Sequence, residues 1–518
     1  MNYRAVIIGL ALGLGVAGMR AEDSVPVIEV KADRIMIYPQ LMELTGEESL
    51  LDVLQMVPEL MISGYEDVIT EYNLRMDNCP INGDERLILN QMKAKDIAKI
   101  HVCTNTGVAK GTIGTGKVLD IVMVMPQAVK GFVEAQGGFG KEIEANGTVN
   151  VLYGSARTDI YANAAYRYQE GHKEYLSLHM TNRFDEKNKL LTYLTQQYLA
   201  LPDGHQQKIM GRARYFHTFN EAGTELLVLG GYQYASDPIY SRQLPMFVLE
   251  LNTPLTKGLT MMAGVEGDYL ITKGKGTDQR WDVYNHDIYL QFTYSLPKWR
   301  FTAGNRVMLY NYRMIDSTAT EKRFDVRNNT DACIIYLPTP QHQIQLGYFR
   351  KYYNPAYPVV WAEVENLLRE LDINQLKAAY AYSRQKLTVQ AEGSFYIVEG
   401  EDNFGEIGAS AYWKTKWVTL TGGMNVHIAR SQVFASVRCA PTAHLPHNWQ
   451  IGVQLVYYTP KSPLRVVYGT PVYGYLKVSK QIGNYLDIGV EWHDMGDAFS
   501  KENTMNRHAG TIRIQYRF

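Results

Sequence analysis

Few residues in this chain have the types and spacing that catalysis or metal binding needs. His444 and His447 are spaced for a metal ion, but no third ligand accompanies them, and a solvated turn explains the pair more simply. The glycine-rich stretch 107–116 lacks the Gly-Lys-Ser/Thr ending of a phosphate-binding loop. No zinc-protease or serine-hydrolase motif is present. We therefore expect a non-enzyme without a cofactor or a resident metal.

Composition narrows the class of protein further. Lys plus Arg number 52 and Asp plus Glu number 53, so a nucleic-acid partner, which would need a basic excess, is not expected. Tyr is abundant, with 37 residues, and Gly contributes 43 more, a balance that favours strands and turns over helices. Four Cys in 518 residues cannot form a disulfide scaffold.

The first 21 residues are typical of a secretory signal peptide. Arg4 precedes an apolar run at 5–18, and small residues follow up to Ala21, the expected cleavage point, although cleavage at 16–18 would also serve. No later segment reaches the roughly 20 apolar residues of a membrane-spanning helix. An exported chain of this kind enters a membrane as a closed barrel of strands, if it enters one at all.

From residue 130 to 518 the sequence alternates apolar and polar residues. The last segment is the clearest, because Ile512, Ile514 and Tyr516 share one face while Arg513 and Gln515 take the other. Segments of about ten such residues, with aromatic residues gathered at their ends, predict a transmembrane β-barrel more strongly than a soluble sandwich or propeller. Counting the segments predicts about 22 antiparallel strands.

The connections support this count. Every second connection is short and often contains Pro, and the connections between them include the longest. The short set is 252–254, 296–298, 337–340 and 444–447; the long set is 273–279, 315–321, 354–374 and 494–504. Short periplasmic turns that alternate with longer outer loops are the asymmetry of outer-membrane barrels.

Residues 22–129 follow a different pattern. A short amphipathic helix at 50–57 is stopped by Pro58, and several short strands come after it. Together they predict a small α/β domain. A lumen of about 22 strands is too broad for the barrel's own side chains to fill, so this domain would plug it.

This segment resembles the plug of TonB-dependent receptors. The matching residues, in chain order, are Asp52, Leu54, Pro58, Gly83, Ile97, Ile100, Val102, Gly116 and Ile121. The sequence departs from the family where Glu59 replaces the usual Gly and His101 replaces the usual Glu. Four weak motifs in order ahead of a barrel make a strong combined signal.

The resemblance implies three parts: a signal peptide (1–21), a plug (22–129) and an outer-membrane barrel (130–518). It also implies a receptor in the Gram-negative outer membrane, surrounded by outer-membrane lipid, that imports a substrate too large or scarce for porins. The energy would come from the inner membrane through TonB. Two rival functions stay open: a plugged barrel without energy coupling that acts as a scaffold for a surface or secretion complex, and a barrel-embedded enzyme.

The resemblance also suggests where partners would bind. A TonB box would lie at Val25, Val27, Ile28 and Val30, where an apolar β-prone run could add to a partner's sheet, although a simple first plug strand explains it equally well. A disulfide between Cys79 and Cys103 is expected because the family pattern pairs their segments as strands; two buried thiols are the alternative.

The expected outer loops are short, so we expect a separate surface lipoprotein to act as a lid over the mouth. Trp361, Val364 and Leu368 form an apolar stripe at helical spacing that could dock it. Packing of this stripe on the barrel rim is the more conservative interpretation.

Overall fold

The computed structural model describes residues 27–30, 35–42, 49–55, 72–76, 79–80, 89, 92–103, 117–139, 143–168, 171–201, 204–277, 279–315, 320–353, 371–384, 386–400, 402–429, 433–460, 472–483, 485–493 and 509–518. The predicted signal peptide, Val25, Pro58, Gly83, Gly116 and the stripe at 361–368 lie outside these ranges. The side chains of Val30, Asp52 and Cys79 are also outside the description.

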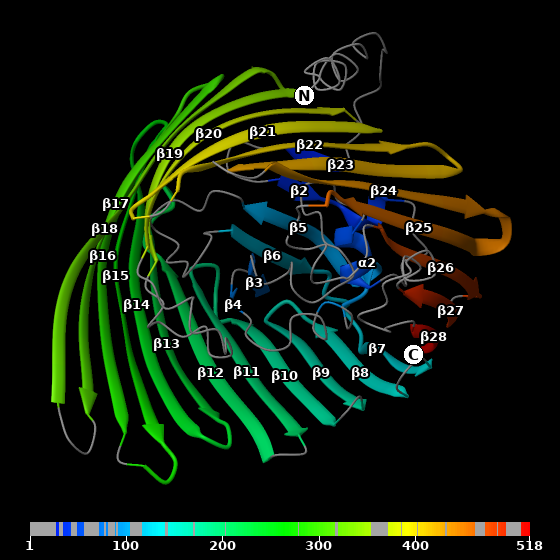
Figure 1. Ribbon diagram of the computed structural model, residues 1–518, viewed down its shortest axis with the longest axis horizontal. Helices are drawn as coiled ribbons and strands as arrows, with labels where there is room; N and C mark the ends of the chain where they lie inside the picture. Colours follow the sequence, from blue (N-terminus) through cyan, green and yellow to red (C-terminus); the bar gives the residue numbers. More distant parts are fainter. Residues whose placement is uncertain are drawn as a thin grey trace.

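The larger part of the chain is a closed barrel of 22 strands, β7 to β28, in which every strand is antiparallel to both neighbours (Figure 1). The strands are β7 (Lys130–Phe139), β8 (Glu144–Gly154), β9 (Thr158–Tyr168), β10 (His172–Arg183), β11 (Asn188–Leu201), β12 (Gly204–Thr218), β13 (Glu225–Ser236), β14 (Tyr240–Thr256), β15 (Leu259–Gly274), β16 (Arg280–Ser295), β17 (Trp299–Ile315), β18 (Thr320–Thr339), β19 (His342–Tyr353), β20 (Leu371–Arg384), β21 (Leu387–Val398), β22 (Phe404–Lys414), β23 (Val418–Ala429), β24 (Val433–Leu445), β25 (Trp449–Tyr458), β26 (Val472–Ile482), β27 (Leu486–His493) and β28 (Ala509–Arg517). Closure occurs where β28 pairs with β7. The predicted strand number is confirmed.

A second, six-stranded sheet lies inside the barrel (Figure 1). Its order is β1-β2-β5-β6-β3-β4, and β3 and β6 are parallel while the other pairs are antiparallel. The elements are β1 (Ile28–Val30), β2 (Ile35–Ile37), η1 (Pro39–Leu41), α2 (Leu50–Gln55), β3 (Tyr72–Met76), β4 (Cys79–Pro80), η4 (Ala94–Asp96), β5 (Ile97–Cys103) and β6 (Lys117–Met123). We call this sheet with its helices the plug.

The barrel strands divide their side chains between two faces. On β28, Ile512, Ile514 and Tyr516 are about half exposed on the outer surface, whereas Thr511 and Gln515 are buried toward the lumen. The predicted alternation is confirmed, and an apolar outer band of this kind is the surface that a bilayer requires. Among the described residues, no helix is long and apolar enough to cross a membrane.

The two rims of the barrel differ. The chain end lies on the same rim as the start of β7, because Gly131 N donates to Phe518 O at 3.1 Å. Connections on that rim are short, whereas the opposite rim carries the long connections between strands, at 354–370, 459–471 and 494–508. The predicted alternation of short and long connections is confirmed. We call the rim with the chain end the inner rim and the other the outer rim.

Two predicted turns are wrong. Residues 252–254 lie inside β14, which ends at Thr256, and β18 continues through residues 337–339 before its turn. Pro254 is accommodated by a shift of register between Pro254 and Thr256 at the end of the strand. Proline is tolerated at such irregular strand ends, so it did not mark the turn itself.

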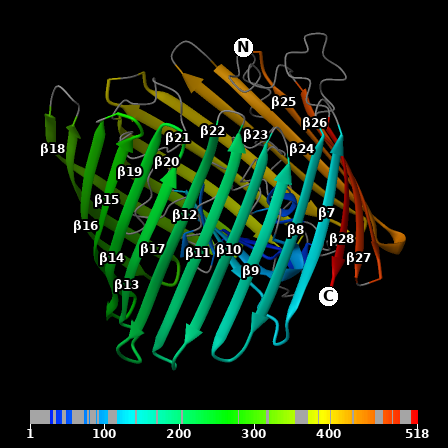
Figure 2. The same ribbon diagram turned by 90° about the horizontal axis from the view of Figure 1, so that it is seen from below.

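The wall is taller on one side than on the other. β14 to β18 have 17, 16, 16, 17 and 20 residues, whereas β27 and β28 have 8 and 9. About 9–11 residues cross a bilayer. The surplus in β14–β18 therefore extends the wall past the membrane, and these strands form the long side of the barrel (Figure 2).

Candidate functional site

Five of the residues that carry the plug resemblance have described side chains, and these five belong to the core of the plug. Leu54, Ile97, Ile100, Val102 and Ile121 are all 0% exposed and belong to one cluster of buried side chains. That cluster continues into barrel tyrosines on β9, β10, β11 and β22. The motif residues thus hold the plug together and help to fix it in the lumen.

The predicted TonB box segment is built into the plug as its first strand. Val27 and Ile28 are buried, and β1 lies at the edge of the plug sheet. Ile28 O accepts hydrogen bonds from the hydroxyls of Ser383 and Thr388, on the barrel strands β20 and β21. Those two strands are joined at the inner rim, so this end of the plug is seated close to that rim.

Tyr38 closes the β1–β2 hairpin. Its backbone N donates to Val27 O at 2.9 Å, and its hydroxyl donates to Glu29 Oε2 at 3.0 Å. Partial burial, followed by the hydrogen bond to Glu29 and its negative charge, raises the pKa of Tyr38 to about 12. The phenol therefore stays a hydrogen-bond donor at physiological pH and holds β1 against β2.

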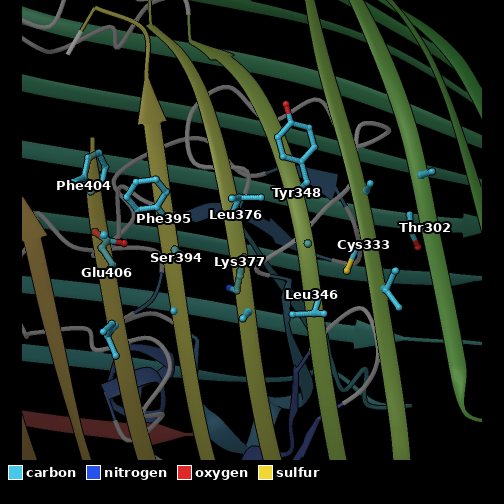
Figure 3. Close-up of a pocket in the computed structure, with 18 of the residues that line it drawn as sticks. Thr302, Cys333, Leu346, Tyr348, Leu376, Lys377, Ser394, Phe395, Phe404 and Glu406 are labelled. Carbon is cyan, nitrogen blue, oxygen red and sulfur yellow. The ribbon is translucent and has the colours of Figure 1, made fainter. Parts of the chain in front are cut away.

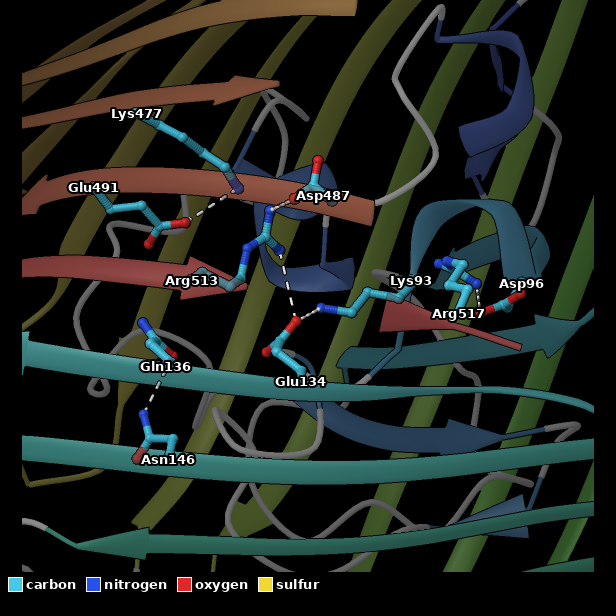
Figure 4. Close-up of polar contacts among 10 residues, drawn as sticks. All are labelled: Lys93, Asp96, Glu134, Gln136, Asn146, Lys477, Asp487, Glu491, Arg513 and Arg517. Carbon is cyan, nitrogen blue, oxygen red and sulfur yellow. Dashed lines mark hydrogen bonds and ion pairs between the residues drawn. The ribbon is translucent and has the colours of Figure 1, made fainter. Parts of the chain in front are cut away.

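An ion pair joins the plug to the first barrel strand. Lys93 Nζ lies 2.5 Å from Glu134 Oε2, and the Lys93 side chain is 0% exposed. Arg513 extends toward the same carboxylate at 3.9 Å and pairs with Asp487 at 2.7 Å (Figure 4). The lysine of the plug therefore enters a charged network that belongs to the site of barrel closure.

Further polar contacts attach the plug to other parts of the barrel wall. Arg517 Nη1 on β28 lies 3.3 Å from Asp96 Oδ2 at the plug's η4. Lys414 on β22 donates to the backbone oxygen of Leu41 at the other side of the plug. These polar contacts add to the apolar packing between the plug core and the barrel.

The predicted disulfide is wrong. Cys79 is in β4 and Cys103 in β5, and the sheet order places β6 and β3 between these strands. Three strand spacings separate the two backbones by about 14 Å. A disulfide needs Cα atoms within about 7 Å, so this pair cannot form one without rearranging the sheet.

A ladder of four rings lines the lumen near the outer rim. Tyr396 and Phe404 stack at 4.5 Å between ring centroids, Phe404 and His427 at 5.0 Å, and His427 and Phe434 at 4.5 Å. These residues share a face with Lys414, which contacts the plug, so they point into the lumen. We call Tyr396, Phe404, His427 and Phe434 the ring ladder.

Hydrogen-bonding groups accompany the ring ladder. Gln375 Nε2 donates to Tyr396 Oη at 3.1 Å, and the Tyr396 hydroxyl donates to Glu406 Oε2 at 3.1 Å. The other carboxylate oxygen of Glu406 lies 3.3 Å from His427 Nδ1. The Glu406 side chain is 50% exposed, so it can accept further hydrogen bonds from a ligand in the lumen.

The outer face of the same wall has an apolar hollow (Figure 3). It is lined by half-exposed side chains such as Leu346, Leu376 and Phe395. Phe395 is seven residues from the plug-contacting Thr388 on β21, so the two side chains lie on opposite faces. The hollow therefore faces the membrane and not the lumen.

His444 and His447, the pair that was considered for a metal ion, have different surroundings. Among the described residues, no group of three or more His, Cys, Asp or Glu residues could hold a metal. His444 Nε2 is 2.9 Å from Thr419 Oγ1 on the neighbouring strand, and His447 lies in the turn between β24 and β25.

Sequence reasoning missed the residues that seat the plug. Lys93 and Glu134 are 41 positions apart, and Ser383 is 355 positions from Ile28. No local pattern links such pairs. A Glu at a lumen-facing position of the first barrel strand was the one available signal, because unpaired charges are seldom buried.

Comparison with known proteins identifies the fold. No protein-family model and no curated protein matches the sequence. Among solved structures, the siderophore receptor PirA of Pseudomonas aeruginosa matches with a TM-score of 0.68 at 10% identity, covering 95% of this chain and 100% of that chain. The ferric-catecholate import receptor Fiu of E. coli K12 matches with a TM-score of 0.69 at 11% identity, covering 96% and 100%. The alcaligin outer-membrane receptor FauA of Bordetella pertussis matches with 0.68 at 10% identity, covering 95% of each. The chain therefore has the plug-and-barrel fold of the TonB-dependent receptors of the outer membrane.

Proposed function

We propose that this protein is a TonB-dependent outer-membrane receptor that imports a substrate too large or too scarce for porins. The observation that carries the proposal is the position of β1 and its attachment to the barrel, which we call the seat of β1. This strand lies at the edge of the plug sheet, close to the inner rim, and two barrel hydroxyls hold its Ile28 carbonyl. A periplasmic partner that adds a strand near this point can pull on the plug.

The ring ladder is the surface that we assign to substrate capture. It faces the lumen near the outer rim and combines aromatic edges with the half-exposed carboxylate of Glu406. A few well-placed polar groups on an aromatic wall are typical of ligand sites. The tall wall of β14–β18 borders the same mouth and is separated from the strands of the ring ladder by β19 and β20.

A surface lipoprotein lid is part of the proposal. The long outer connections are confined to 354–370, 459–471 and 494–508, so loops alone supply little surface to cover a ligand. The stripe of Trp361, Val364 and Leu368 belongs to the first of these connections. Purification of the tagged protein in mild detergent should recover a lipoprotein in near-equal amount; recovery of the barrel alone with full ligand affinity would refute the lid.

Coupling is tested by binding of the periplasmic domain of TonB to the purified full-length protein. Val25→Pro removes a backbone donor that strand addition needs, while Val25→Ala keeps it. We expect the proline variant to lose binding and the alanine variant to retain it. If the parent protein does not bind TonB, or the proline variant binds as well as the parent, energy coupling is wrong and the scaffold function takes its place.

The capture surface is tested by mass spectrometry of molecules that co-purify with the protein. Phe404→Ala and Glu406→Gln should each lose a molecule that the parent retains. Tyr284→Ala is the matched control, because Tyr284 stacks on Tyr269 at 4.0 Å on the outer face of the wall. Retention of the same molecule by all variants would rule out the ring ladder as the capture surface without touching the TonB result.

A further inference from the structure

The outer part of β18 has a strand partner on one side only. β18 has 20 residues, whereas its second neighbour, β19, has 12. β17 accompanies β18 to its outer end, where Ile315 pairs with Thr320. Pairing with β19 reaches only as far as Thr330 and Arg350. Among the strands that the structure describes, the stretch 320–329 of β18 is therefore paired with β17 alone.

Backbone groups of alternate residues point to the unpaired side of this stretch. Leu337 N donates to Lys298 O, on the β17 side, at 2.8 Å, so the odd-numbered amides of β18 face β17. The pairing of β17 with β18 continues from there to Thr320 without a shift of register. The even-numbered amides and carbonyls at 322–328 therefore face away from β17. We call the residues that carry them the open edge: Lys322, Phe324, Val326 and Asn328.

The open edge is accessible to a partner. Phe324 and Val326 are exposed, and Val326 N is bonded to the side chain of the preceding residue, Asp325 Oδ1, at 2.9 Å, a contact that a pairing strand can replace. Tyr352 of β19 donates its amide to the side chain of Asn329, at 2.7 Å, so the regular backbone ladder has ended at this height. An unpaired edge of this kind is a template for an added strand.

Apolar side chains reappear on the open edge above the membrane. On the outer face of β18, Ile334 lies in the apolar band and is followed by the polar Thr330 and Asn328. Beyond these, Val326 is 52% and Phe324 is 65% exposed. Phe324 lies about 15 residues from the inner end of β18, which at about 3.4 Å per residue and a tilt of about 40° is roughly 40 Å along the barrel axis. The apolar band is about 25 Å tall, so lipid does not cover this pair, and a protein contact would.

A direct continuation of β19 is poorly suited to fill the open edge. Such a strand would follow Tyr353 outward, and its sequence contains Pro355 and Pro358. Because successive residues of a strand face opposite sides and these prolines are three positions apart, one of them would face β18 in any register. A proline there offers no N–H to the ladder.

A second copy of the chain is also poorly suited. Two barrels inserted in one membrane have the same orientation, so their β18 strands both run toward the inner rim. The antiparallel pairing that every strand of this barrel uses is then impossible between them. A strand from a different protein is free of this restriction, since its direction is not fixed by the membrane.

We propose that the open edge receives an extended strand of the surface lipoprotein lid, added antiparallel to β18 above the membrane. The proposal rests on the lid of the proposed function for its partner and assigns the lid a contact on the barrel itself. Apolar residues at every second position of the added strand cover Phe324 and Val326. The place suits a lid, because β18 is three strands from β21, where the ring ladder begins.

The test uses full-length protein purified from its native outer membrane in mild detergent, with the co-purifying lipoprotein quantified by mass spectrometry. Lys322→Pro removes an N–H of the open edge, whereas Lys322→Ala removes the side chain and keeps that N–H. Val326→Pro and Val326→Ala form a second matched pair. Heat-modifiable migration on a gel checks that each barrel is folded. Amide hydrogen exchange of 320–328, with the lipoprotein bound and after its release, reports strand pairing directly.

We expect both alanine variants to retain the lipoprotein and both proline variants to lose roughly tenfold of it, because the ladder is interrupted. Exchange at 320–328 should be roughly tenfold slower in the parent complex than in the barrel alone. Equal recovery in the proline and alanine variants, or unchanged exchange, would overturn the open edge as the docking site and leave the lid intact.

Two further outcomes would also overturn this docking site. Slow exchange at 320–328 in the barrel alone would show that the chain covers its own edge, and recovery of a dimer that the proline variants abolish would show that a second copy does. Absence of any lipoprotein from the parent would refute the lid together with its docking site. The import function is judged separately, by the binding of TonB.

Discussion

Lys93 of the plug and Glu134 of the first barrel strand form an ion pair of 2.5 Å whose lysine is fully buried. Breaking a buried pair from one side leaves an uncompensated charge and costs about 3–5 kcal/mol. The pair therefore contributes to holding the plug in the lumen, and displacement of the plug from this position would have to break it.

Glu134→Gln should loosen the plug and make cells that express the protein more sensitive to vancomycin, an antibiotic too large for porins. Adding Lys93→Met to this variant should restore part of the barrier, because the buried charge is then gone. Glu491→Gln is the control, since it breaks the 3.3 Å pair with Lys477 inside the barrel wall. Equal sensitivity of the two single variants would show that the plug contact has no special role.

Tyr38→Phe should make the β1–β2 hairpin of the plug open more often. The change removes the hydrogen bond to Glu29, worth about 1.5 kcal/mol, so amides of β1 and β2 should exchange hydrogen roughly tenfold faster. Tyr485→Phe, at an exposed turn, should leave their exchange unchanged.

The pH dependence of this effect follows from the raised pKa of Tyr38, about 12. The folded plug holds the phenol proton more tightly than the unfolded chain does, so the stabilisation is fully present below the ordinary pKa of about 10. It is lost as the pH rises through about 12. The protection ratio between parent and variant should therefore be constant from pH 7 to 9, and a fall within that range would contradict this assignment.

The barrel could be predicted from the sequence because the residue pattern that specifies each strand lies within that strand. Ile512 and Gln515 reveal their faces through the two-residue period, and a slip of one residue would expose every polar side chain of the strand to lipid. Strand number and the asymmetry of the rims follow from the same repeat. Strand ends were less certain, because Pro254 and Pro338 are tolerated inside β14 and β18.

The plug and the candidate site could be predicted only in part. The hydrophobic motif residues mark the core, but the order of six short strands depends on contacts between distant segments. The parallel pairing of β3 with β6 is such a contact, and it separates Cys79 from Cys103. The ring ladder needs residues from four strands at one height, which only the register of the folded sheet provides.

Barrel closure should depend on the absence of a side chain at Gly131. A Cβ there would lie 2.3 Å from Asn150 O and 2.7 Å from the ring of Phe518, next to the strand pairing that closes the barrel. Gly131→Ala should reduce the yield of heat-modifiable barrel in the outer membrane. Gly137→Ala on the same strand meets nothing within 4 Å and should assemble normally. Normal assembly of both variants would mean that the closing strands can shift freely.

The two rims should differ in their access from outside the cell. Lys275 lies between β15 and β16 at the outer rim, and Pro297 lies between β16 and β17 at the inner rim, one strand further along. Because β16 crosses the membrane between them, a maleimide that cannot permeate should label Lys275→Cys on intact cells and leave Pro297→Cys unlabelled until the cells are opened. Both changes belong in a Cys439→Ala background, since Cys439 is an exposed native thiol. Labelling of Pro297→Cys alone would reverse the orientation of the barrel, and with it the assignment of the β1 seat to the periplasmic side.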